Sequence, residues 1–68
     1  MNIIEFLEMQ EPTQQVQIFL YEEISLHMIA YTNARMLIPS PNKVFRSLQI
    51  VSVGEIKDTL VVVVIKPH

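Results

Sequence analysis

Few side chains in this chain could carry out catalytic chemistry. Nucleophilic catalysis needs a nucleophile, a base and a group that orients the base. The two histidines are His27, in the middle of an apolar segment, and His68, the last residue of the sequence. A histidine in an apolar segment is more often structural than catalytic. We therefore expect no catalytic residue and no enzymatic activity.

The acidic residues do not form an obvious acid–base pair or metal site. Glu5 and Glu8 lie one helical turn apart, Glu22 and Glu23 are adjacent, and Asp58 is the only aspartate. Paired-carboxylate catalysis needs two acids in one cleft with different pKa values, whereas these fit solvated positions better. The chain has no cysteine and one glycine, which excludes thiolate metal sites and a glycine-rich phosphate loop. We expect no metal and no other cofactor.

One short segment combines basic and aromatic residues. In "SPNKVFRS", Lys43, Phe45 and Arg46 would allow base stacking next to phosphate contacts, and Lys57 and Lys66 add charge in the same half of the chain. The alternative is a capped helix that buries Phe45 and turns its charges outward. The formal charge of −2 lacks the basic excess typical of duplex-binding proteins. A nucleic-acid-associated accessory protein is therefore the less favoured of two functional hypotheses.

Composition favours one small folded domain spanning residues 1–68. Half of the residues are hydrophobic, and the mean hydropathy is +0.33, which argues against disorder. No segment approaches the roughly 20 apolar residues that span a bilayer, and the N-terminal segment lacks the basic start of a signal peptide. We expect a cytoplasmic protein without a membrane partner.

The N-terminal segment predicts a short helix. Asn2 and Glu5 have the spacing of a capping box, and apolar residues follow on one helical face. Pro12 disfavours helical dihedrals at the residue before it. We expect a helix over residues 3–10.

Residues 16–31 match two templates, because their apolar residues fit both a helical stripe and two alternating strands. A hairpin with a loop at 21–23 pairs Leu20 with Ile24, and also Ile18 with Leu26 and Val16 with Met28, so that all of these side chains share one face. No Gly, Asn or Asp is present for a left-handed loop position. We favour the hairpin, with His27 facing away from the core.

The rest of the chain predicts two helical segments and two strands. Thr32 can cap a turn over 33–37, and Ser40 with Pro41 can start a helix over 41–47. Residues 48–53 form a strand that Gly54 ends, 55–58 a turn, and 59–65 the last strand. The predicted fold is α+β: a short N-terminal helix, a β-hairpin, one or two short helices, and two further strands in a four-stranded antiparallel sheet.

Three segments, "EFLE", "QQVQIFLY" and "IVSVGEIKDTLVVVVI", resemble small uncharacterised proteins of phages and prophages of Gram-positive bacteria. Those proteins commonly end in an Asp-x-Leu-x-Val pattern, which Asp58, Leu60 and Val62 match. The hairpin loop of this chain departs from the resemblance, because Glu22-Glu23 stands where Gly or Asn is usual in those proteins. The resemblance implies the fold and a phage or prophage origin.

The last strand, "LVVVVI", is apolar on both faces, which is typical of strands covered on both sides. Leu60, Val62 and Val64 can face the helices. The opposite face then needs a cover, which a second copy in a homodimer, or another host or phage protein, would supply. Alternatively, the helices divide between the two faces. The residues expected at this interface are Phe19, Tyr21, Ile29, Tyr31, Val61, Val63 and Ile65.

Overall fold

The computed structural model describes residues 1–67, and His68 lies outside the described range. These residues form three short helices and four strands. In chain order the elements are α1 (Ile3–Glu8), β1 (Gln15–Glu22), β2 (Ser25–Asn33), α2 (Ala34–Leu37), α3 (Lys43–Ser47), β3 (Gln49–Ile56) and β4 (Thr59–Ile65).

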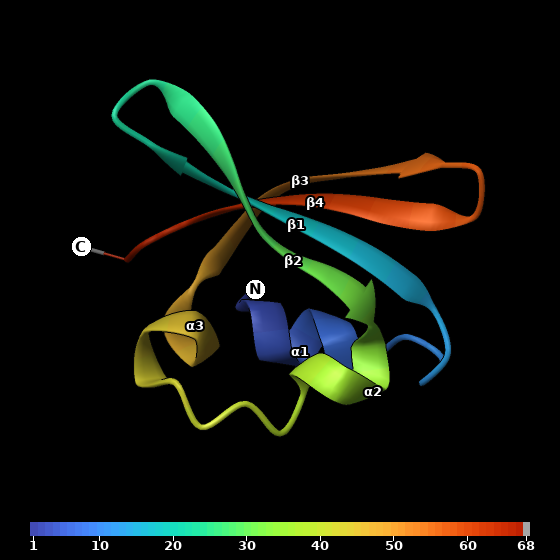
Figure 1. The fold of residues 1–68 in the computed structure, drawn as a ribbon. Helices are drawn as coiled ribbons and strands as arrows, with labels where there is room; N and C mark the ends of the chain where they lie inside the picture. The colour runs from blue at the N-terminus through green and yellow to red at the C-terminus, as the bar shows by residue number, and fades with distance from the viewer. Residues whose placement is uncertain (68) are drawn as a thin grey trace.

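The four strands form one sheet in the order β2-β1-β4-β3, and all three helices lie on one side of it (Figure 1). The predicted α+β class is confirmed, but the prediction of a purely antiparallel sheet is wrong. Each hairpin is antiparallel, whereas the central strands β1 and β4 are parallel. The chain returns beneath the sheet through α2 and α3, which lets β4 enter the sheet beside β1 in the same direction. Parallel pairing suits β4, because a central strand is shielded along both edges.

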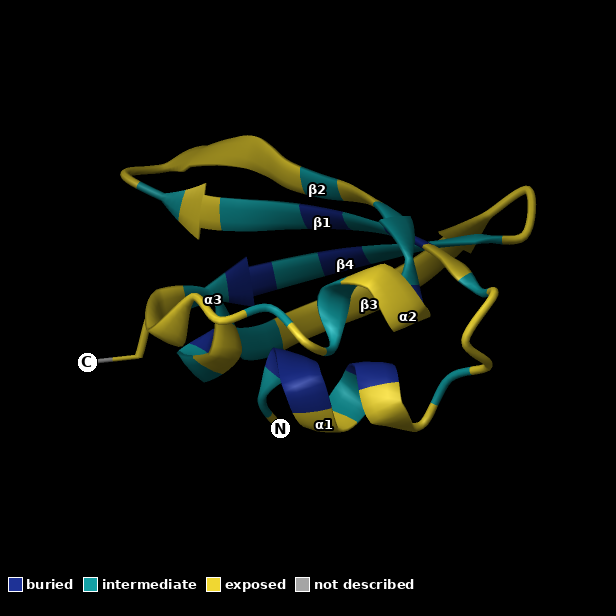
Figure 2. Ribbon diagram, turned by 60° about the horizontal axis from the view of Figure 1, so that its bottom comes forward, coloured by how far each residue is buried: buried dark blue, intermediate teal, exposed yellow. Residues whose placement is uncertain are grey.

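The core lies between α1 and the two central strands (Figure 2). The apolar spacing of α1 places Ile3 and Leu7 against the sheet, and its first turn is held by the predicted capping box. The Asn2 side chain accepts from the Glu5 amide at 2.9 Å, and Glu5 accepts from the Asn2 amide at 3.0 Å. Such reciprocal capping matters in a six-residue helix, which is unstable alone. Other buried residues are Ile4, Val16, Ile18, Ala34, Leu48, Val62 and Val64.

The hairpin over residues 16–31 is present, but its predicted register is wrong. Its loop has two residues, Glu23 and Ile24, and both have positive φ, 53° and 58°. Leu20 therefore pairs with His27 rather than with Ile24. The changed loop shifts β2 by three residues relative to β1, and an odd shift moves alternate side chains to the opposite face.

A β-bulge then restores the expected alternation further along β2. The register shifts between Ile18 and Phe19, which pair with Ala30 and Met28, so Ile29 is the extra residue. Beyond the bulge, Val16 pairs with Thr32. The prediction was therefore correct about the face of Ala30 and wrong about the residues nearer the turn.

The boundaries of α2, α3 and β3 differ from the predicted ones, because side-chain capping and strand pairing decide where these elements begin and end. Asn33 and Asn42, rather than Thr32 and Ser40, cap α2 and α3, since each Asn side chain accepts the amide three residues ahead. Gly54 does not end β3 but pairs with Val61 inside it. The last strand, 59–65, has the predicted bounds.

Candidate interaction surface

Across the described part of the chain, no hydrogen bond or ion pair joins His27 to an acidic side chain. His27 is exposed and pairs with Leu20, so it lies on the helix side of the sheet rather than on the predicted opposite face. Glu5 is engaged in the cap of α1. Among residues 1–67, no group of three or more His, Cys, Asp or Glu residues could hold a metal ion. Within the same range, no helix is long and apolar enough to cross a membrane.

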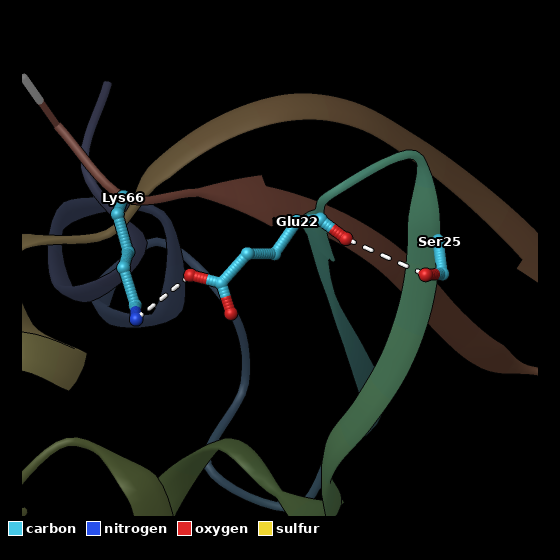
Figure 3. Close-up of polar contacts among 3 residues, drawn as sticks. All are labelled: Glu22, Ser25 and Lys66. Atoms are coloured by element: carbon cyan, nitrogen blue, oxygen red, sulfur yellow. Dashed lines mark hydrogen bonds and ion pairs between the residues drawn. The ribbon is translucent and has the colours of Figure 1, made fainter.

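Glu22 forms an ion pair with Lys66 across the ends of β1 and β4 (Figure 3). The Lys66 Nζ lies 2.8 Å from Glu22 Oε2. The hydrogen bond from Lys66, together with its positive charge, lowers the pKa of the Glu22 carboxyl below its ordinary value. The pair continues the parallel register of Leu20 and Val64, so it links the ends of the two central strands at the surface.

A cleft of about 270 Å³ opens beneath the β1–β2 hairpin on the helix side. It contains no nucleophile with a neighbouring base, and its lysine, Lys66, is already paired with Glu22. Ile29 lies here rather than on the predicted interface, because the bulge turns its side chain toward the helices. The lining residues are Leu20, Ile29, Asn42, Val44, Phe45, Leu48 and Lys66.

The structure separates the residues proposed for nucleic-acid binding. Lys43, Phe45 and Arg46 share α3, but Lys57 lies in the β3–β4 turn at the opposite end of the molecule (Figure 1). Phe45 is half-buried against the core and lines the cleft, so its ring is not a free stacking platform. Arg46 Nη1 donates to the carbonyl of Ile38 at 2.6 Å and to that of Ser40 at 3.1 Å. These contacts favour the alternative, in which α3 is a packed and capped helix.

The face of the sheet opposite the helices, which we call the outer face, bears most of the predicted interface residues. The register places Phe19, Tyr21, Tyr31, Val61, Val63 and Ile65 there. The described residues contain no second layer over this face, which excludes the alternative in which the helices divide between both faces (Figure 1).

Two further outer-face residues, Leu26 and Met28, were missed by sequence reasoning. The hairpin register pairs them with Tyr21 and Phe19, and it moves them away from the core positions that alternation alone assigned. Between 47% and 59% of Tyr21, Leu26, Met28 and Tyr31 is exposed. The signal that would have placed them correctly is the length of the turn, which the composition of Tyr21 to Ile24 does not reveal.

None of the positions on the outer face carries a formal charge. This follows from the strand register, in which every Lys, Arg, Asp and Glu lies on a helix, in a turn or loop, or on the helix side of the sheet. The two tyrosines alone expose roughly 200 Å² here, taking about 200 Å² for a whole aromatic side chain. The complete outer face is Gln15, Gln17, Phe19, Tyr21, Leu26, Met28, Tyr31, Asn33, Gln49, Ser52, Gly54, Ile56, Thr59, Val61, Val63 and Ile65.

Comparisons of the chain with protein-family models, with curated proteins and with solved structures gave no match.

Proposed function

We propose that this chain is a non-enzymatic protein-interaction module that self-associates by packing one outer face on another. The observation that carries the proposal is the charge-free outer face. A sheet face that contacts water normally carries polar and charged side chains. An apolar patch of several hundred Å² is instead typical of an interaction site.

A second copy is the occupant that this face fits best. Packing two uncharged faces together leaves no charge without a partner, whereas a strongly charged partner would lose hydration without compensation. All twelve charged residues of each copy, seven acidic and five basic, would stay outside the contact. Sheets that pack face to face interdigitate their side chains across about 10 Å, as the valine, isoleucine and tyrosine side chains on this face allow.

The phage-like sequence pattern supports a more specific setting for the module. We propose that it is encoded by a phage or prophage and acts in the host cytoplasm as an inhibitor or adaptor of a host or phage protein. Capture of such a partner would use the outer face in competition with self-association. The proposal predicts that a variant unable to self-associate also loses the partner.

Light scattering over a range of concentrations tests self-association. Val63→Lys places a charge in the middle of the outer face and should halve the mass of the face-to-face assembly. Val44→Lys is the matched control, because Val44 is exposed on α3, away from the outer face. The proposal fails if wild type has the mass of one chain, 7.9 kDa, at every concentration, or if both variants have the same mass as wild type.

A further inference from the structure

The two free edges of the sheet differ in how well they are protected. The edge of β3 is partly covered at its start, where the Ile50 amide donates to the Met1 carbonyl at 3.0 Å and Asn2 bridges to Gln49. Its far end carries Glu55 and a second bulge lies at Val51. Charges, bulges and covering segments are the usual means by which proteins block a sheet edge.

The edge of β2 has much less protection. Ser25–Asn33 contains no Lys, Arg, Asp, Glu or Pro, and no described segment pairs with its outer side. Its one blocking feature is the bulge at Ile29, which divides the strand. Most of β2 is exposed along its length (Figure 2). A nine-residue edge without a charge is a template for another strand.

The hairpin geometry identifies the backbone groups that are free on this edge. Glu22 and Ser25 flank the two-residue turn and so form its closing hydrogen-bonded pair. Because hydrogen-bonded and non-bonded pairs alternate along an antiparallel ladder, Leu26 and Met28 direct their N–H and C=O groups away from β1. Beyond Met28 the bulge at Ile29 changes this phase. Between the turn and the bulge, Leu26 and Met28 are therefore the two residues whose main-chain N–H and C=O groups point to the free side of β2.

We propose that β2 pairs antiparallel with β2 of a second copy, about a two-fold axis that passes beside His27. Leu26 of each copy then lies opposite Met28 of the other, and four main-chain hydrogen bonds form between them. This register uses both free residues of each copy and leaves the turn and the bulge outside the ladder. A two-fold contact of this kind is self-complementary, so the second copy supplies the same neutral strand.

Charge favours this antiparallel arrangement with a second copy. The hairpin turn carries the acidic Glu23, since the preceding Glu22 is already paired with Lys66, whereas the other end of β2 leads into α2, which carries Arg35. Antiparallel pairing directs the acidic turn of each copy toward the basic end of the other. Parallel pairing would bring the two acidic turns together.

The paired edges make one continuous sheet of eight strands with all helices on one side and both outer faces on the other. The inference concerns the edge, so it holds whether or not the outer face self-associates as proposed above. If both contacts form, four copies assemble. The edge pair alone would present a charge-free face twice as large.

Cysteine cross-linking tests the register, because the chain has no native cysteine. The proposed axis makes His27 and its copy a non-hydrogen-bonded pair with Cα atoms about 4.5 Å apart, within disulfide range. His27→Cys should therefore convert almost completely to a disulfide-linked dimer under mild oxidation. Ser25→Cys controls for register, since the two residues would be displaced by about 13 Å along the strands, and Glu55→Cys controls for random collision.

The result is decided by the comparison of these three variants, each shown by circular dichroism to be folded. Cross-linking of His27→Cys that is no more complete than that of the two control variants would overturn the proposal. A second measurement separates the edge from the outer face: His27→Lys should halve the mass of Val63→Lys if that variant is still a dimer. If Val63→Lys is monomeric and His27→Cys does not cross-link, the edge is free and only the outer face associates.

Discussion

Two adjacent valines of β4 offer a direct test of which face is buried. Val62 is 0% exposed and pairs with Ile18 and Val53, whereas Val63 lies on the outer face. We predict that Val62→Lys unfolds the protein and that Val63→Lys leaves it folded. The substitution is chemically identical in both variants, so the difference isolates the effect of position.

The magnitude follows from burial and charge. Val62→Lys loses about 1.5–3 kcal/mol of apolar burial. An unpaired ammonium at that position adds several kcal/mol, because Val62 lies in an entirely apolar core. A core of this size supplies only about 3–5 kcal/mol of stability, which the sum exceeds. Val63→Lys changes mainly strand propensity, by less than about 1 kcal/mol.

Circular dichroism at 25 °C and thermal unfolding measure the outcome. Val62→Lys should lack the wild-type spectrum, and the Tm of Val63→Lys should fall by no more than about 8 °C. Both proteins are measured at low concentration, because self-association at high concentration would raise the Tm of wild type alone. Equal unfolding of both variants, or a folded Val62→Lys, would refute the assignment of faces.

Three further predictions concern the cap of α1, the Glu22–Lys66 ion pair and the β1–β2 turn. Asn2→Ala should lower the free energy of unfolding by about 1 kcal/mol, measured by urea denaturation, because it removes the side-chain acceptor of the capping box. Lys66 lowers the pKa of the Glu22 carboxyl in the folded state, so the pair stabilises the fold fully at a pH above 4.5, the ordinary pKa of this group. This contribution is lost as the pH falls through the lowered pKa of the folded state. In Glu22→Gln the Tm should therefore decrease less at acid pH than in wild type. The same dependence of Tm on pH in both proteins would contradict a stabilising role of the ion pair. Ile24→Gly should raise the free energy of unfolding by about 1 kcal/mol, since Ile24 is 91% exposed and has a φ of 58°; a lower urea midpoint would refute the strain.

Local signals in the sequence were sufficient for the helix cap and the last strand. Asn2 and Glu5 form the expected capping box because the interaction spans only three residues. The β-branched run from Val61 to Val64 gave the correct strand and the correct alternation of faces. Such features depend on neighbours in the chain, so a sequence pattern reports them well.

The hairpin register depended on information that the sequence does not display. Glu23 and Ile24 adopt left-handed conformations that favour Gly or Asn, so the turn was placed too early in the chain. The bulge at Ile29 then restored the alternation beyond it, which left Leu26, His27, Met28 and Ile29 on the wrong faces. Tertiary pairing with β1 therefore prevailed over local turn preference. Six of the seven residues predicted for the interface therefore lie on the outer face, and Ile29 does not.

The parallel pairing of β1 and β4 has a consequence for the order in which the chain folds. Each hairpin is a local unit, but two isolated strands are at best marginally stable in water. The contact that joins the hairpins is distant in sequence: the Gln14 side chain, next to β1, donates to the Asp58 carbonyl, 44 residues away. Closing such a loop slows folding. Until β4 arrives, the β1–β2 hairpin has two open edges, and the rate of closure determines how long misassociation can compete with folding.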